Sequence, residues 1–197
     1  MISGWLNFWR GRSNWILFLI AFIAQYGFSR VFLLGENSAW GKAVEGAGGI
    51  TPEEQFGFLP NEPMRSIEIL HNNNAVGDYA TWQLIDFPFA VLNVVAITAA
   101  ISLFLRKANL QHSALRFLLF LPIIYFFAEL IENSLVASFA LKAISPTSIP
   151  VIIQQTATSI KLLAGNGGLI IGLLGVAGAA LIQLLAILKS LLNRGAS

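Results

Sequence analysis

Four long apolar runs, almost free of charged side chains, constrain this chain more than any other feature. They cover about residues 15–34, 80–105, 114–140 and 149–190. A helix needs about 20 apolar residues to cross the hydrocarbon core of a bilayer, and each run reaches that length. Because no water satisfies backbone groups inside a bilayer, each run is expected to be helical. The sequence therefore predicts an all-α membrane protein.

Composition agrees with this class of protein and disfavours others. Charged residues make up 11% of the 197 residues, against about 25% in soluble domains. A net charge of +2 with scattered basic residues does not favour nucleic-acid binding. The chain has no cysteine, which excludes disulfides and Cys-ligated metals. The run 15–34 is longer than a signal-peptide core and no A-x-A-like site follows it, so we expect it to be retained.

The last apolar region is too long for one simple span. As a single helix it would measure about 60 Å, twice the thickness of a bilayer core. The stretch GNGG at 165–168 favours a break there. The fourth span is then 168–188, and residues 149–164 form either a separate amphipathic helix or the upper turns of the same helix. The predicted fold is a four-helix transmembrane bundle in one membrane domain, residues 1–197.

The distribution of charge predicts the orientation of the bundle. Basic residues flank one end of the spans: Arg10, Arg12, Arg106, Lys107, Arg116, Lys189 and Arg194. The loop of about residues 35–79 carries Lys42 and Arg65 against seven acids: Glu36, Glu45, Glu53, Glu54, Glu62, Glu68 and Asp78. Short basic flanks mark the cytoplasmic side. Both termini are therefore expected on the cytoplasmic or equivalent side of a bacterial inner or organellar membrane, with the loop extracytoplasmic.

The loop itself has two parts. GENSAWGKAVEGAGG is rich in glycine and predicts irregular structure. NEPMRSIEILHNNN predicts a short helix capped by Asn61, with Met64, Ile67 and Leu70 on one face. Asp78 is expected to cap the second span, and Pro88 to kink it.

Charged residues in or near the spans predict a polar cluster in the outer third of the bundle: Arg30, Asp86, Glu129, Glu132 and Lys161, with Asn133. Glu129 and Glu132 are three residues apart and share a helix face. An ionised carboxylate in the bilayer core costs several kcal/mol, which favours pairing. Two cations against three acids are neutral if one carboxyl keeps its proton. The cluster is either a polar clamp that fixes helix register or a site for a ligand headgroup, an ion or a proton.

A stripe of small residues in the last span offers a smooth packing surface: Gly168, Gly172, Gly175 and Ala179. Such a stripe lets a second helix approach closely. The partner is either a helix of the same bundle or another protein.

Known catalytic, cofactor and metal motifs are missing from the sequence. His71 and His112 fall in loops, which disfavours bis-histidine haem ligation. Metal-protease, phosphate-loop and serine-hydrolase motifs do not occur. We therefore expect no cofactor and no metal, and the sequence assigns no catalytic residue.

Three short elements resemble a family of small four-span integral membrane proteins of bacteria and fungi. They are Tyr79 with Asp86 and Pro88, the run Glu129-Leu130-Ile131-Glu132-Asn133, and the run Thr158-Ser159-Ile160-Lys161. The chain departs from the family pattern at Ala75-Val76, where Gly-Arg is usual, in the position of the proline, and at Glu129, where Asp is usual. The resemblance implies the four-span fold and brings no established activity.

These observations lead to two functional hypotheses. The first is an accessory or assembly subunit of a larger membrane complex, with membrane lipids and other membrane subunits as partners and no nucleic acid. The alternative is a small membrane enzyme or carrier that binds a lipid or quinone-like ligand at the outer polar cluster. A proton-coupled transporter is a third hypothesis, which four spans could form only as an oligomer.

Overall fold

Helices account for all regular structure in the described residues, 2–12, 14–35, 37–54 and 58–195, of the computed structural model. Glu36 of the acidic loop lies outside these ranges. The α-helices are α1 (Ile2–Arg12), α2 (Trp15–Phe32), α3 (Ala39–Gly46), α4 (Asn61–Asn72), α5 (Val76–Lys107), α6 (Leu121–Ala140) and α7 (Ser148–Gly195), with short 3-10 helices η1 (Pro52–Glu54) and η2 (Ala114–Phe120).

Four of these segments are long and apolar enough to cross a membrane. They are Trp15–Phe32, Val76–Lys107, Ala114–Ala140 and Ser148–Asn193. The prediction of an all-helical chain with four candidate spans is confirmed, although three shorter helices of the described residues, α1, α3 and α4, accompany them.

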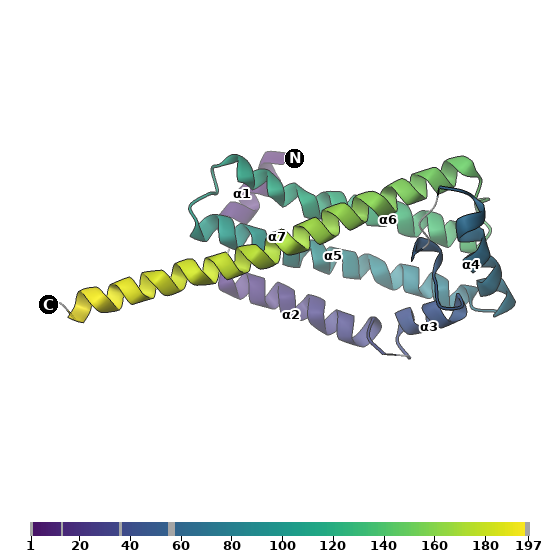
Figure 1. The fold of residues 1–197 in the computed structure, drawn as a ribbon, viewed down its shortest axis with the longest axis horizontal. Coiled ribbons are helices and arrows are strands. Elements are labelled where there is room, and N and C mark those ends of the chain that lie inside the picture. Colours follow the sequence, from purple (N-terminus) through teal and green to yellow (C-terminus); the bar gives the residue numbers. More distant parts are fainter. Residues whose placement is uncertain (1, 13, 36, 55–57, 196–197) are drawn as a thin grey trace.

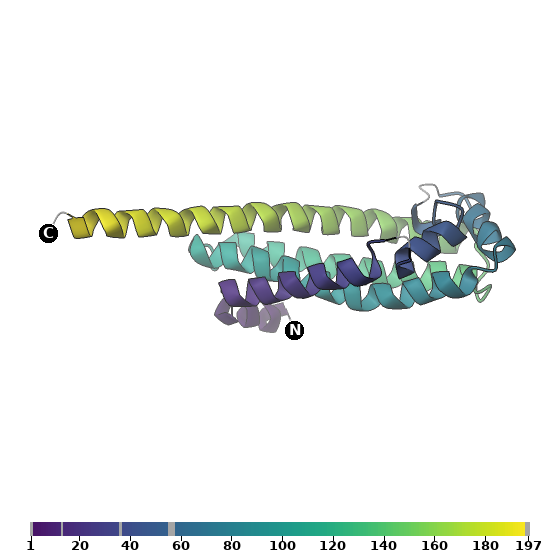
Figure 2. The ribbon, with the colours of Figure 1, turned by 90° about the horizontal axis from the view of Figure 1, so that it is seen from below.

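Helix α5 lies at the centre of the arrangement. It packs against α6 and α7, which also pack against each other, and α2 runs along α5 (Figure 1). Helices α3 and α4 gather at one end of the molecule, which we call the loop end. Helix α1 and the α5–α6 connection lie at the other, which we call the basic end (Figure 1). Helix α7 projects beyond the basic end in both views (Figures 1 and 2).

The break expected at residues 165–168 does not occur, because α7 is one helix from Ser148 to Gly195. Of the two alternatives for residues 149–164, the structure has the upper turns of the same helix. Two of the glycines serve close packing instead. A Cβ on Gly165 would lie 2.8 Å from Tyr125 Cδ2, and one on Gly168 would lie 3.3 Å from Ile97 Cγ2. A helix satisfies its own backbone groups, so an apolar surrounding favours continuation through glycine.

The loop end is more regular than the sequence predicted. The glycine-rich stretch contains α3, whose first turn is capped by Ser38 Oγ accepting from Gly41 N at 2.9 Å. Ala43 and Ala47 are fully buried, so packing outweighs the low helix propensity of glycine. Irregular backbone remains on both sides of this helix, with positive φ at Gly35 before it and at Gly48 and Gly49 after it.

Helix α4 forms where predicted, but two expected caps are wrong. Pro60, and not Asn61, precedes the helix, and no side chain caps it. Helix α5 begins at Val76, which places Asp78 inside its first turn. The helix also continues through Pro88.

Helix α1 was not predicted and is held by long-range contacts at the basic end. Trp5 Nε1 donates to Leu119 O at 3.1 Å, and Trp9 is buried. Its role is to cover the end of α5.

Candidate functional site

Most of the predicted polar cluster meets at the interface of the three central helices. Glu129, Glu132 and Asn133 of α6 are buried there, facing Asp86 of α5 and Lys161 of α7. We call this set the polar layer, together with Thr158, which bonds to Glu132, and with Glu53, Tyr79 and Gln83, which bond to one another and interact electrostatically with the set through Glu53.

Lys161 joins α7 to α6. Its Nζ lies 3.3 Å from Glu129 Oε1 and also donates to Glu132 Oε2. The other oxygen of Glu132 accepts from Thr158 Oγ1. Both oxygens of Glu132 are therefore paired, and the residue is fully buried. A charge-assisted pair of this kind stabilises the buried carboxylate that it neutralises.

The α5 side of the layer is held by an amide. Asn133 Nδ2 donates to Asp86 Oδ2 at 2.9 Å. Asp86 is also an electrostatic neighbour of Glu129 and Lys161. Glu129 Oε2 is buried and has no hydrogen-bond partner among the described residues. This oxygen is unsatisfied when Asp86 and Glu129 are both ionised, which is costly in a buried position, and a proton shared between the two carboxyls would satisfy it.

Arg30 does not join the layer, and its predicted place there is wrong. It is exposed on α2, where its Nε donates to Tyr26 Oη at 2.8 Å and its guanidinium lies 5.4 Å from the Tyr26 ring. The side chain finds this partner one turn earlier on its own helix, and α2 packs along α5 and not between α6 and α7. Lys161 is left to face the acids.

Sequence reasoning missed an acid from the loop. Glu53 of η1 reaches into the loop end of the bundle, where Tyr79 Oη donates to its Oε2 at 2.6 Å and Gln83 Nε2 to its Oε1 at 3.1 Å. The available signal was the Thr-x-x-Glu capping box, in which Thr51 N donates to Glu54 Oε2 at 3.0 Å. That box fixes the turn that carries Glu53, but it does not reveal the long-range partners.

Buried glutamines extend the layer toward the loop end. Gln155 Nε2 donates to Gln154 Oε1 at 3.0 Å, and Gln154 Nε2 to Thr158 Oγ1 at 2.9 Å. These residues also lay outside the predicted set, although their spacing places Gln154 one turn before Thr158.

The layer has more acid than base. Asp86, Glu129 and Glu132 are buried beside Lys161, and Glu53, which is partly exposed, interacts electrostatically with Glu132 and Lys161. Full ionisation would leave an uncompensated negative charge in a weakly polar interior, so bound protons are favoured over four carboxylates. No group of three or more side chains suited to a metal ion occurs within the described ranges. The chemistry that this arrangement offers is hydrogen bonding and proton binding.

Glu53→Gln is expected to reduce the pH dependence of stability. Burial raises the pKa of Glu53 above its ordinary value, and the hydrogen bond from Tyr79 lowers it in part. Such an acid holds its proton more tightly when folded, so its stabilisation is complete below the unfolded pKa and is lost as pH rises through the folded pKa. The measurement is thermal unfolding in detergent between about pH 4 and pH 8. The unfolding temperature of the variant should rise relative to that of the natural protein as the pH increases.

Glu68→Gln is the matched control for this measurement, because Glu68 is exposed on α4. It should show no such trend. A difference between Glu53→Gln and the natural protein that is constant over the pH range contradicts the prediction.

The glycine stripe packs inside the chain. A Cβ on Gly172 would lie 3.3 Å from Ala100 Cβ, and one on Gly175 would lie 3.0 Å from Phe104 Cβ. Ala179 is fully buried. Helix α5 therefore occupies this surface, which is the first of the two alternatives that the sequence left open.

An apolar groove of about 470 Å³ runs between α6 and α7 on their outer side. Phe127 and Ile131 line it from α6, and Ile153 and Ile160 from α7. Ile131 and Ile160 directly precede Glu132 and Lys161 in sequence. The groove thus lies at the same depth as the polar layer.

Comparisons of the chain with protein-family models, curated protein sequences and solved structures return no match. A functional proposal therefore depends on the geometry of the polar layer.

Proposed function

We propose that this chain is an integral membrane protein, a carrier or an enzyme, that binds the headgroup of an amphipathic quinone-like ligand at the polar layer. One observation carries the proposal. Within the described residues the buried acceptor Glu129 Oε2 could be satisfied only by a proton shared with Asp86, and the Lys161 side chain beside it is 19% exposed and so within reach of a ligand. A hydroxyl of the ligand would satisfy the carboxylate, and a carbonyl would accept from the ammonium.

The charge of the layer favours a neutral headgroup. Acids outnumber Lys161, so an anionic headgroup would add to the repulsion. A quinone or quinol has neutral oxygen acceptors and donors on one ring. The groove between α6 and α7 supports the same ligand class, because its apolar lining suits a hydrocarbon tail.

Binding of a short-tail ubiquinone analogue tests the proposal. The purified full chain should bind it saturably, and Glu129→Gln should weaken binding about tenfold, the effect of losing one charge-assisted hydrogen bond. Glu68→Gln, an exposed carboxyl on α4, should bind like the natural protein. Equal thermal stability of the two variants would show that the fold is intact. Absence of saturable binding, or equal binding by all three proteins, would leave the polar clamp as the role of the layer.

We further propose a four-span orientation with the loop end outside. The segregation of charge supports it, because Arg10, Arg106 and Arg116 lie at the basic end and the acidic loop at the other. The chain has no cysteine, so a thiol reagent labels only a cysteine that has been introduced by substitution. In intact cells a membrane-impermeant maleimide should label Glu68→Cys at once and His112→Cys only after permeabilisation, since both positions are exposed. The reverse pattern would invert the proposed orientation.

An accessory subunit is a second candidate, favoured by the free end of α7. Residues 184–193 project beyond the basic end and are exposed on all faces, including Leu184, Leu188 and Leu191. At about 1.5 Å per residue they extend about 15 Å. In gentle detergent, the full chain should co-purify with a stoichiometric membrane subunit, and a chain ending at Gln183 should not. A full chain that purifies alone and monodisperse contradicts this candidate.

A further inference from the structure

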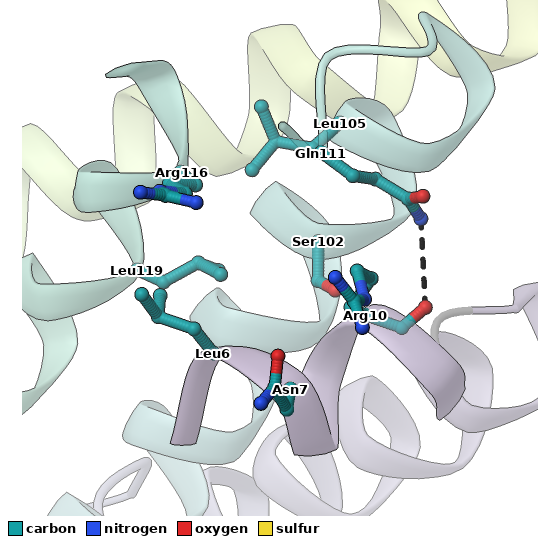
Figure 3. Close-up of a pocket in the computed structure, with 8 residues that line it drawn as sticks. All are labelled: Leu6, Asn7, Arg10, Ser102, Leu105, Gln111, Arg116 and Leu119. Atoms are coloured by element: carbon teal, nitrogen blue, oxygen red, sulfur yellow. Dashed lines mark hydrogen bonds between the residues drawn. The ribbon is translucent and has the colours of Figure 1, made fainter. Parts of the chain in front are cut away.

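A small pocket at the basic end is built from three elements that are distant in sequence. Helix α1 supplies Asn7 and Arg10, the end of α5 supplies Leu105, and the connection to α6 supplies Gln111, Arg116 and Leu119 (Figure 3). Figure 3 shows Arg10 and Arg116 on different walls of the same opening. The pocket is separate from the polar layer, which lies toward the loop end.

Long-range hydrogen bonds hold the walls in place. Trp5 Nε1 donates to Leu119 O at 3.1 Å, and Gln111 Nε2 donates to Arg10 O at 3.5 Å (Figure 3). Ser102 Oγ donates to Trp9 O at 3.2 Å beneath the pocket. The two arginines are therefore brought together by the fold and not by their positions along one helix.

No acid of the chain balances this charge locally. All ten acidic residues fall between positions 36 and 86 or at 129 and 132. Arg10 and Arg116 are exposed and belong to segments without an Asp or Glu. Two guanidinium groups over one opening create a positive site for an anion, and arginine binds phosphate oxygens in pairs.

The rim of the pocket has the character of a membrane interface. Exposed apolar side chains adjoin its lining residues in sequence: Phe8 (46% exposed) follows Asn7, and Leu115 (44%) and Phe117 (53%) flank Arg116. The Arg116 guanidinium lies 5.3 Å from the Phe117 ring. Mixed arginine and aromatic side chains at the ends of spans lie at the depth of lipid headgroups. Phosphate at this depth belongs to lipid.

We propose that this pocket binds the phosphate of an anionic phospholipid. Arg10 and Arg116 hold the phosphate oxygens, and the amides of Asn7 and Gln111 supply further donors. Leu105 and Leu119 are buried and form the floor of the pocket, and the exposed Phe8, Leu115 and Phe117 contact the first acyl carbons. A headgroup without an amine is preferred, because the ammonium of a zwitterionic lipid would meet two positive charges. The proposal is independent of the ligand at the polar layer.

Titration of the purified full chain with short-chain phosphatidylglycerol, phosphatidylcholine and inorganic phosphate tests the proposal. Phosphatidylglycerol should bind most tightly, and R10Q/R116Q should weaken its binding about tenfold or more. The control K42Q/K189Q removes the same charge away from the pocket, since Lys42 is exposed on α3 at the loop end and Lys189 is on the projecting end of α7. The control should bind with nearly natural affinity.

Three results would overturn the proposal. Equal losses of phosphatidylglycerol affinity in the two double variants would show that the overall positive charge of the protein, and not this pocket, attracts the lipid. Inorganic phosphate binding as tightly as the lipid, with the same dependence on Arg10 and Arg116, would show a site for a free anion. Equal affinity for both lipids would remove the preference for anionic lipid. If R10Q/R116Q does not fold, R116K replaces it: it keeps the charge but loses the paired donors, and should still bind more weakly than K42Q/K189Q.

Discussion

Lys161→Met is expected to destabilise the protein by about 3–5 kcal/mol, because it removes the cation from a buried pair and leaves Glu129 and Glu132 without it. Protonation of a carboxyl would relieve part of this cost, so the loss should be larger at high pH than at low pH. Thermal unfolding in detergent, followed by circular dichroism, measures the effect.

Two further variants distinguish the lost pair from a general effect of removing charge. E132Q/K161M removes Lys161 together with one of its two carboxylate partners and should recover part of the stability, because an absent pair costs less than a broken one. Arg30→Met removes a cation that is exposed and bonded to Tyr26, and should change stability by about 0.5 kcal/mol or less. If Lys161→Met unfolds at the same temperature as the natural protein, the pair does not stabilise the fold.

Gly175→Leu is expected to destabilise the protein by about 1–3 kcal/mol through overpacking. A Cβ there would lie 3.0 Å from Phe104 Cβ and 3.8 Å from Ala100 O. These atoms belong to or adjoin the backbone of α5, so α5 and α7 must move apart. The change should also lower the unfolding temperature in detergent, where α5–α7 contact cannot be replaced by lipid.

Gly167→Leu is the matched control, because nothing lies within 4 Å of the Cβ it would add. Both substitutions gain helix propensity of up to about 1 kcal/mol, so that term cancels in the comparison. Equal stability of the two variants would mean that the stripe does not pack against α5 as closely as the structure places it.

The four candidate spans could be predicted from sequence because their signal is local. Length and apolar character alone require a helix in a bilayer. The break at 165–168 and the irregular loop before Gly48 were wrong for the opposite reason. Gly165 packs against Tyr125 within a continuous helix, and the burial of Ala43 stabilises α3 in the glycine-rich stretch. Both contacts are distant in sequence, so the local glycine content did not reveal them.

The polar layer was predictable where it depends on depth in the bundle. Asp86, Glu129, Glu132 and Lys161 meet because α5, α6 and α7 run in alternating directions and bring these positions to the same level. Glu53 was missed, since a loop residue has no periodic position from which a partner follows. Arg30 was misplaced because depth does not specify which face of a helix a residue occupies.

The residues that carry the family resemblance gather in this layer. Tyr79, Asp86 and Glu132 each take part in its hydrogen bonds, as do Asn133, Thr158 and Lys161. Membership of the family stays a prediction.

Because α7 is one continuous helix, motion at one point along it is transmitted to both of its ends. From Lys161 the helix runs about 20 Å to its loop-end start and about 50 Å to Gly195, at about 1.5 Å per residue. Lys161 ties it to α6 at a point nearer the loop end. A small tilt of α7 about that tie would be magnified more than twofold at the opposite tip. Because α7 is one helix, a ligand that displaced Lys161 at the polar layer, as proposed above, would also shift the projecting leucines.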